Sequence, residues 1–359
     1  MAPPAVPTST AVPVKFEIGV NFPWAGKSEG WWLGPALWDE SGIEAKPRTP
    51  IWWLAEMKQD FATLASYNIR LVRIFLLASC QNVQPRITYS PGTLWGTKPN
   101  PWMPDEHQDP RFQEHFRALL QAAKDTGIRL IPCFLSFDVV YNQRYVVLTD
   151  QEAQRRMRDG LLVPFLNIAK DFRDTILCWD VINEPFWTLI AETDGRPTPG
   201  WPANKNPHIL WEGTVNKAIN YYAEAIKQAN FKWTVGHRFD GQSGLPNGDI
   251  RQLHFYGNWP SEKVWGLPKG DAQTILGEFD IGIGTQAVGV DYWSQTLWGS
   301  GVQTPETITT RLKYIRQQGY GVALFWPNKT WDLSRLGEKV PLEYETQELQ
   351  EISAFIKTL

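Results

Sequence analysis

The sequence contains few cysteines, no long apolar run and no marked excess of charge. Its three cysteines, Cys80, Cys133 and Cys178, are too few and odd in number for a disulfide framework. No apolar run reaches the length of about 18 residues that a transmembrane helix needs, so we expect no membrane span. The formal net charge is −3. Nothing in this charge balance favours binding to nucleic acid or to an anionic membrane surface.

The sequence also lacks the glycine-rich phosphate turn that usually follows the first strand of a doubly wound α/β fold. Short β-rich apolar runs alternate instead with longer helical patterns, which is typical of parallel strands joined by helical crossovers. The runs predict strands at 16–22, 70–77, 129–137, 176–183, 231–237, 249–256, 274–280 and 321–327. Helices are predicted at 52–68, 111–127, 151–174, 209–230, 304–319 and 342–359.

Eight strands with helices between them predict a single (β/α)8 TIM barrel in the α/β class, with the doubly wound sheet as the alternative. We expect the barrel domain to span residues 15–359. Residues 1–14 are rich in proline, alanine and threonine and predict a flexible N-terminal segment. They show no secretory signal pattern. Export is favoured if such a signal has been removed and the cytoplasm otherwise, so localisation stays open, as does the oligomeric state.

Tryptophan, in contrast, is abundant, with 19 residues. Sugar rings stack their apolar C–H faces on flat, rigid aromatic side chains, and indole suits this contact. Any single tryptophan is more often part of the core. As a group, however, they favour some role at a carbohydrate site. Candidates beside the expected rim loops are Trp24, Trp31, Trp32, Trp187, Trp259 and Trp265.

Polar residues cluster towards the ends of the predicted strands, although a buried strand does not need polar residues there. Arg73 interrupts the second strand, and the residues at the ends of later strands are Asn183, Glu184, His254, Tyr256, Glu278 and Trp326. A buried ionisable group is costly unless it is paired or faces a wet site. The carboxyl ends of all barrel strands meet at one face, so these residues predict one shared site. Two carboxylates there are typical of glycoside hydrolysis, and retaining enzymes hold them about 5–5.5 Å apart.

Two of the segments that contain these residues resemble segments of a known family. The segment WDVINEP at 179–185 is similar to the acid/base motif of the clan A retaining glycoside hydrolases, especially the cellulase-like family five. The segment ILGEFD at 275–280 resembles their nucleophile strand. Asn-Glu-Pro alone is a modest signal, but the other strand ends match in the same order. The resemblance spans nearly all eight predicted strands.

The resemblance implies a role for each matching position. Glu184 would be the general acid and then the general base, and Glu278 the nucleophile. Arg73 would hydrogen-bond Glu278 and keep it ionised, and Tyr256 would touch the same carboxylate. The resemblance also implies three substrate contacts: Asn183 to the sugar 2-hydroxyl, His254 to the reacting sugar, and Trp326 as its stacking floor.

One position departs from the pattern of the family. These enzymes often carry a histidine at the end of the third strand, where this chain reads Ser136-Phe137-Asp138. Asp138 is therefore a candidate for a sugar contact, or the subsite is shaped differently. The departure affects the exact family and the substrate rather than the two carboxylates.

The leading hypothesis is a retaining hydrolase of β-linked glucan, mannan or a related oligosaccharide or polysaccharide. A transglycosylase with the same two glutamates is an alternative. A non-catalytic carbohydrate-binding barrel is another, although it would usually lose one glutamate. We expect no cofactor and no metal, because two carboxylates suffice for the reaction. The sequence does not decide the sugar, the linkage or endo against exo attack.

Overall fold

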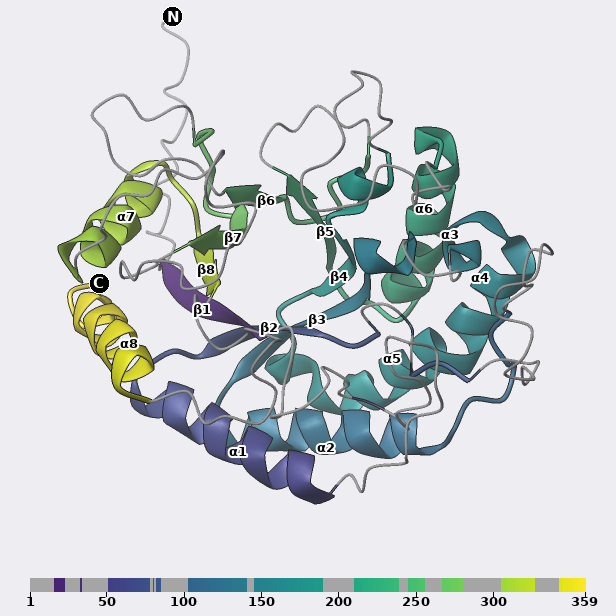
Figure 1. Ribbon diagram of the computed structural model, residues 1–359, viewed down its shortest axis with the longest axis horizontal. Coiled ribbons are helices and arrows are strands. Elements are labelled where there is room, and N and C mark those ends of the chain that lie inside the picture. Colours follow the sequence, from purple (N-terminus) through teal and green to yellow (C-terminus); the bar gives the residue numbers. More distant parts are fainter. Residues whose placement is uncertain are drawn as a thin grey trace, which may run out of the picture.

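The computed structural model shows eight parallel strands that close into one barrel, in the order β1 to β8 (Figure 1). It describes residues 16–22, 33, 51–77, 80, 82–84, 103–140, 145–189, 210–238, 245–255, 267–280, 305–326 and 342–359. The predicted (β/α)8 barrel is confirmed, and the doubly wound alternative is wrong because β1 pairs with β8. The expected flexible segment 1–14 lies outside the described residues.

All eight strands coincide with predicted ones and are mostly shorter. They are β1 (Glu17–Phe22), β2 (Leu71–Phe75), β3 (Arg129–Ser136), β4 (Trp179–Asn183), β5 (Trp233–Arg238), β6 (Gln252–Phe255), β7 (Ile275–Asp280) and β8 (Val322–Trp326). Their apolar runs extend beyond the hydrogen-bonded ladder because flanking residues such as Ile250 and Ile176 also enter the core. The apolar runs of the sequence therefore predicted the strands but overestimated their length.

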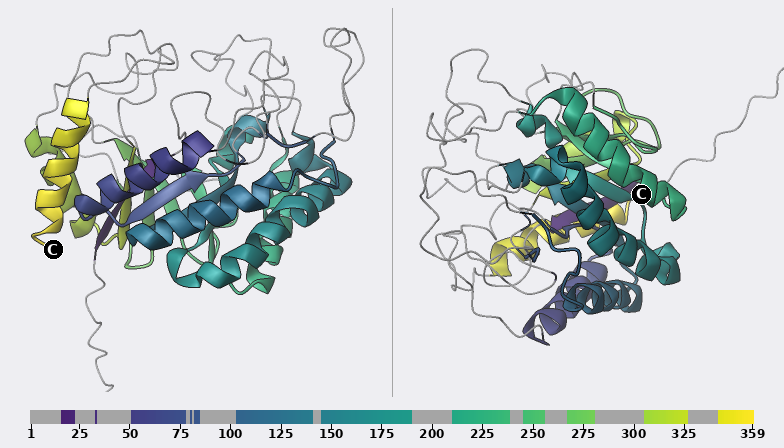
Figure 2. Two further views of the ribbon diagram at one scale, coloured as in Figure 1. Left: turned by 90° about the horizontal axis from the view of Figure 1, so that it is seen from below. Right: turned by 90° about the vertical axis from the view of Figure 1, so that its right-hand side faces the viewer.

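Long helices cover the outside of the barrel. They are α1 (Ile51–Ser66), α2 (Arg111–Thr126), α6 (Glu212–Gln228), α7 (Pro305–Gln317) and α8 (Leu342–Ile356). Helices α1 and α2 pack side by side, as do α7 and α8 (Figure 2). Helix α2 ends at Gly127, which adopts φ 69°. This left-handed conformation is tolerated best by glycine, which makes Gly127 a favourable C-cap.

The single helix expected over 151–174 is wrong in detail. The segment divides into α4 (Gln151–Met157), a π-helical turn (Arg158–Leu162), α5 (Val163–Ala169) and a 3-10 segment (Lys170–Thr175). Pro164 lies in the first turn of α5 and has no N–H to continue the preceding ladder. Gly160 packs closely, since a Cβ there would lie 3.1 Å from the Glu106 carbonyl oxygen. Short helices, α3 (Val146–Thr149) and two 3-10 turns (Phe137–Val140 and Pro185–Thr188), follow β3 and β4.

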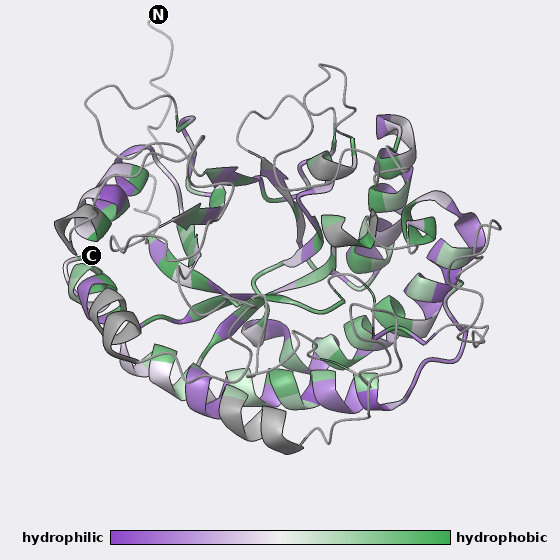
Figure 3. Ribbon diagram, in the orientation of Figure 1, coloured by the Kyte–Doolittle hydropathy of each residue, from purple (hydrophilic) through white to green (hydrophobic). Residues whose placement is uncertain are grey.

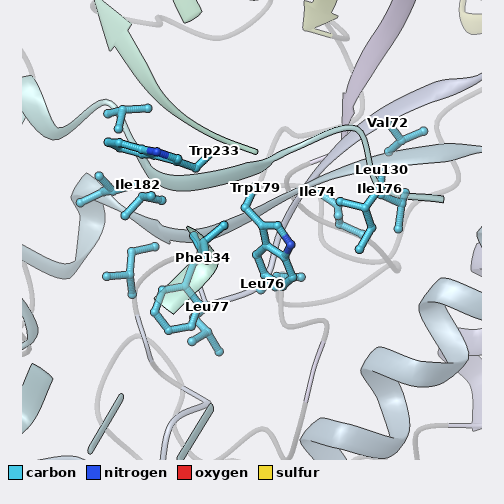
Figure 4. Packing of buried hydrophobic residues seen from close by; sticks show 14 of the residues in the cluster. Val72, Ile74, Leu76, Leu77, Leu130, Phe134, Ile176, Trp179, Ile182 and Trp233 are labelled. Carbon is cyan, nitrogen blue, oxygen red and sulfur yellow. The ribbon is translucent and has the colours of Figure 1, made fainter. Parts of the chain in front are cut away.

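The main hydrophobic core lies between the sheet and the helices. It combines alternate strand residues, such as Val72 and Ile74 of β2, with helix residues such as Phe116 of α2. Trp179 of β4 packs in this layer, with its ring centroid 5.8 Å from that of Phe116. Figure 4 shows Trp179 close to Phe134 and Leu76. The alternation of the strand side chains leaves the other half of each strand facing the barrel interior.

The interior of the barrel holds a second, smaller hydrophobic cluster. Its buried members lie in β2, β3, β7 and β8 or directly before β4 and β6: Leu71, Ile131, Cys178, Ile250, Ile275 and Leu324. None of them is a helix residue, so the cluster fills the closed sheet from within. The strands are largely hydrophobic but carry hydrophilic positions, most visibly on β6 and β7 (Figure 3). These polar positions begin one layer above the inner cluster and lead to the candidate site.

Among the described residues, no helix combines the length and the apolar character that a bilayer crossing requires.

Candidate active site

The closed sheet brings the predicted polar residues together at the carboxyl ends of their strands. Arg73 of β2 donates from Nη1 to Glu278 Oε1 of β7 over 2.8 Å. His254 Nδ1 of β6 lies 2.9 Å from Oε1 of Glu184, the residue that follows β4. Asn183, the last residue of β4, accepts from Arg73 Nη2 over 2.7 Å. One connected group thus joins residues from four strands.

The two glutamates form a close pair. Oxygen atoms of Glu184 and Glu278 lie within 4.8 Å of each other, and both lie within that distance of a nitrogen of His254. His254 Nδ1 is 3.4 Å from Glu278 Oε1 and so faces both carboxylates. The Glu278 side chain is only 4% exposed, whereas that of Glu184 is 13% exposed. Glu184 is therefore the more accessible member of the pair.

The backbone at Glu184 adopts an uncommon conformation. Its φ of 45° and ψ of 51° lie in the left-handed region, which a residue with a Cβ enters at a cost of about 1–3 kcal/mol. The Glu184 N–H donates to the Gly236 carbonyl oxygen of β5 over 2.9 Å, which holds the turn to the sheet. Pro185 then begins a 3-10 turn. The chain thus leaves β4 sharply, and Glu184 is held at the barrel end.

Arg73 is the centre of a buried network below the glutamates. Its side chain is fully buried and contacts two carboxylates, Asp180 through Nε (2.9 Å) and Nη2 (2.7 Å), and Glu278 through Nη1. Nη1 also donates to Asn21 Oδ1 of β1 over 3.0 Å. Asn21 in turn donates to the Gly277 carbonyl oxygen over 2.8 Å. Residues of three other strands, β1, β4 and β7, therefore hold the guanidinium in one orientation.

The charges of this network determine which groups are ionised. Burial alone lowers the pKa of Arg73, but the carboxylates of Asp180 and Glu278 outweigh it and raise the pKa above its ordinary value. Arg73 is therefore a permanent cation. Burial lowers the pKa of His254 to about 4, even though the nearby Glu278 carboxylate acts in the opposite direction. His254 is thus neutral near neutral pH. Burial also raises the pKa of the Cys133 thiol well above its usual range.

Aromatic rings lie beside this network at the ends of β2 and β8. Trp326 is half-buried and meets Phe75 edge to face, with ring centroids 6.3 Å apart. The Arg73 guanidinium carbon lies 4.7 Å from the centroid of the Phe75 ring. Phe75 thus connects Trp326 to the charged network and fixes one side of the indole.

Two of the predicted site residues cannot be placed in the same way. Tyr256 follows β6 and lies outside the described residues. The backbone of Asp138 lies in the 3-10 turn Phe137–Val140 directly after β3, but its side chain is outside the described part of the chain. The tryptophans expected at the rim, namely Trp24, Trp31, Trp32, Trp187, Trp259 and Trp265, also have side chains outside it. The roles of these residues stay predictions.

Three buried polar residues of the network were not predicted from the sequence. They are Asn21, Asp180 and Gln252, each 0% exposed. A signal for two of them was present, because Asn21 and Asp180 each stand between apolar residues in a run that a buried strand would complete. Their partners, however, lie on other strands. Gln252 Nε2 donates to Asp180 Oδ2 over 2.9 Å across 72 positions of sequence.

On donor atoms alone, Glu184, His254 and Glu278 could also hold a metal ion. The Arg73 guanidinium already places a fixed positive charge 2.8 Å from the Glu278 carboxylate. A second cation at the same carboxylate would be repelled by it. The arrangement therefore fits acid–base and nucleophilic chemistry better than metal binding.

Comparison by sequence and by structure gives different results. No family model and no curated protein matches the sequence of this chain. Solved structures do match. A β-1,4-D-mannanase from Cryptopygus antarcticus aligns with a TM-score of 0.59 at 16% identity, covering 94% of this chain and 90% of its own. A β-1,4-mannanase from the sea hare Aplysia kurodai aligns with a TM-score of 0.58 at 16% identity, with 95% and 92% covered.

A GH5_18 protein from Streptomyces cattleya, solved in complex with Manβ1-4GlcNAc, is also similar. It aligns with a TM-score of 0.55 at 14% identity, covering 96% of this chain and 80% of its own. These alignments extend over nearly the whole chain, so the likeness concerns the complete barrel. At such identities it establishes a shared fold, while the chemistry has to be argued from the site.

Proposed function

We propose that this protein is a retaining β-glycoside hydrolase whose catalytic pair is Glu184 and Glu278. The observation that carries the proposal is the approach of the two carboxylates to within 4.8 Å, at the carboxyl ends of β4 and β7. Retaining glycosidases hold their carboxyl groups about 5–5.5 Å apart, whereas inverting ones need about 6.5–9.5 Å to admit a water molecule. The observed separation supports the first geometry.

The environments of the two glutamates support different roles. In the first step, Glu278 would attack the anomeric carbon and form a glycosyl ester, while Glu184 gives its proton to the leaving oxygen. In the second step, Glu184 would take a proton from water as that water attacks and releases Glu278. The buried Glu278 is held by Arg73, which keeps it ionised and aimed. The more exposed Glu184 is better placed to exchange protons.

Asp180 completes this scheme electrostatically. When Glu278 becomes an ester, it loses its charge and no longer neutralises Arg73. Asp180 accepts two hydrogen bonds from Arg73 and is itself fully buried. The guanidinium would therefore keep a carboxylate partner throughout the cycle. A buried cation without one would be strongly destabilised.

We propose β-mannosides as the first substrate class to test, within a wider range of β-linked glucans and mannans. Two of the similar structures are β-1,4-mannanases, and a third contains Manβ1-4GlcNAc. The residues proposed to bind the sugar are Asn183, His254, Tyr256, Trp326 and Asp138. Of these, Asn183 has the clearest support. Arg73 binds its Oδ1, and this fixes which end of the amide is the donor.

The proposal is tested by incubating the protein with β-1,4-linked manno- and gluco-oligosaccharides and with Manβ1-4GlcNAc. Proton NMR of the first product formed reports its anomeric configuration, and mass spectrometry reports its size. We expect cleavage with a β-configured initial product. Products longer than the substrate would indicate transfer to sugar instead of water. An α-configured initial product would exclude the retaining mechanism, and no turnover of any β-linked substrate would refute the proposal.

A further inference from the structure

The side-chain amide of Gln252 lies between an acidic group and an imidazole. Its Nε2 donates to Asp180 Oδ2 over 2.9 Å and lies 3.3 Å from His254 Nε2. Its Oε1, in contrast, has no hydrogen-bond partner among the residues that the structure describes. The two contacts of the amide nitrogen therefore decide how this side chain is oriented.

The opposite orientation of the amide is unfavourable. It would place Oε1 against Asp180 Oδ2, an oxygen that already accepts two hydrogen bonds from Arg73. Two acceptors at that distance repel each other. The Gln252 side chain also packs against the backbone of two glycines, in space that only a residue without a Cβ leaves open. A Cβ on Gly236 would lie 2.8 Å from Gln252 Nε2, and one on Gly277 would lie 2.6 Å from its Cγ.

The orientation of Gln252 determines the tautomer of His254. A neutral imidazole has one N–H and one acceptor nitrogen. Since Gln252 Nε2 is a donor, His254 Nε2 must accept, and the proton must lie on Nδ1. That Nδ1 faces Glu184 Oε1 at 2.9 Å and Glu278 Oε1 at the longer distance of 3.4 Å. The Nδ1–H therefore donates chiefly to Glu184.

We propose that Gln252 is a positioning residue that holds His254 in its Nδ1–H form, and that His254 thereby directs the exchangeable proton of Glu184 to Oε2. With Oε1 engaged as the acceptor of the Nδ1–H, a proton on Glu184 belongs on the other oxygen. Gln252 would touch neither substrate nor reacting atoms and would act through His254. The kinetic part of this inference rests on the proposed function, whereas the tautomer does not.

Charged and titratable groups from several strands surround His254 and enter any pH effect. They are Glu184, Glu278, Arg73, Asp180 and His237. Arg73 and Asp180 form a fixed ion pair, and burial keeps His254 neutral. The protonation of the two glutamates is then the main variable at the site during turnover.

The tautomer is measured by NMR on the full chain labelled with 15N-histidine. The chain has only five histidines, and the signals of His254 are those absent in His254→Asn. Long-range proton–nitrogen correlations distinguish a protonated from an unprotonated ring nitrogen. In the wild type we expect Nδ1 protonated and Nε2 unprotonated. In Gln252→Met, which keeps the length of the side chain but removes the donor, we expect a shift toward the Nε2–H form.

The wild-type spectrum alone can overturn the inference, whatever the folding of the variant. An Nε2–H or doubly protonated His254 at neutral pH would do so. A folded Gln252→Met that retains the Nδ1–H form would show that Gln252 does not set the tautomer. If the spectra agree with expectation but no β-glycoside is cleaved, the proposed function fails and the tautomer assignment stands.

The placement of the proton is tested by kinetics on a cleaved substrate. We expect Gln252→Met to lower kcat about tenfold with little change in KM, the scale of one net hydrogen bond. The basic limb of the pH profile of kcat/KM should move to higher pH, because ionised Glu184 loses a donor. Gln273→Met, at an exposed glutamine on a turn, is the matched control. A lower kcat with an unmoved limb would indicate a structural role only.

Discussion

The two ends of the barrel interior differ sharply although the same strands form both. At the amino end the side chains are apolar and include Leu71, Ile275 and Leu324. Further along β2 and β7, Arg73 and Glu278 replace them and form a buried ion pair. Two or three residues along each strand thus separate a packed hydrophobic layer from a charged one.

Within a single strand, the residues that stabilise the fold are therefore separate from the residues proposed to act in catalysis. The amino end excludes water and gains from apolar burial. The carboxyl end carries several buried polar groups, and each of them needs a partner from another strand. The contrast predicts that substitutions at the two ends change different quantities. The polar end should affect turnover first, and the apolar end the free energy of unfolding. Asp180 lies between them and should affect both.

The largest effect is expected for Glu278→Gln, which keeps shape and removes the nucleophile. Turnover should fall by about four orders of magnitude or more. The loss of stability should be smaller than for Asp180→Asn, because Arg73 keeps its two hydrogen bonds to Asp180. Initial rates on an aryl β-glycoside and on a natural substrate, together with thermal unfolding, measure both quantities. Near-normal turnover of the variant would exclude Glu278 as the nucleophile.

Asp180→Asn should have the next largest effect, because it removes the permanent partner of Arg73. Breaking a buried pair from one side costs about 3–5 kcal/mol. We expect a comparable loss in the free energy of unfolding, measured with denaturant, together with a lower kcat. Asp171→Asn is the matched control, since Asp171 pairs with Arg117 at the exposed surface and should change little. Equal losses for both variants would show that Asp180 is not a special partner.

The sequence predicted the barrel because its strands are buried on both faces. Such strands read as continuous apolar runs, and their alternation with helices leaves few possible folds. It predicted Glu184 and Glu278 because both follow these runs closely within recognisable segments. The helix over 151–174 was predicted incorrectly, since its pattern does not reveal how Gly160 and Pro164 alter the hydrogen-bond ladder.

The buried network below the two glutamates could not be predicted, because it consists of contacts between residues of different strands. Asp180, Gln252 and Asn21 each bind partners far away in sequence, and the barrel register decides which residues meet. Irregular pairing adds to this, as the register shifts between Asp180 and Asn183 and between Leu253 and His254. Such shifts rotate the following side chains relative to the sheet. Simple alternation therefore does not tell which residues face the interior.

At the apolar end, Leu324→Ala tests the other half of the comparison. Leu324 is fully buried in the inner cluster, and its removal should lower the free energy of unfolding by about 2–5 kcal/mol. We expect kcat to be unchanged below the unfolding temperature. Leu177→Ala, at the half-buried edge of the same cluster, should lose less. A large fall in kcat for Leu324→Ala without loss of stability would contradict the separation.

The smallest effect is expected when the pH is lowered and the free energy of unfolding responds through His254 at the polar end. Burial lowers the pKa of His254 from 6.5 to about 4. Between these pH values the unfolded chain binds a proton on this imidazole that the folded chain does not, so stability falls as pH decreases. The neutral His254 contributes its full share to the free energy of unfolding above pH 6.5. This share is lost as the pH falls to about 4, and the total loss is roughly 3 kcal/mol at most. The difference in unfolding free energy between wild type and His254→Asn should therefore shrink over this range.

His107→Asn, at an exposed histidine, is the control. A difference independent of pH would show that His254 is not held neutral by its surroundings.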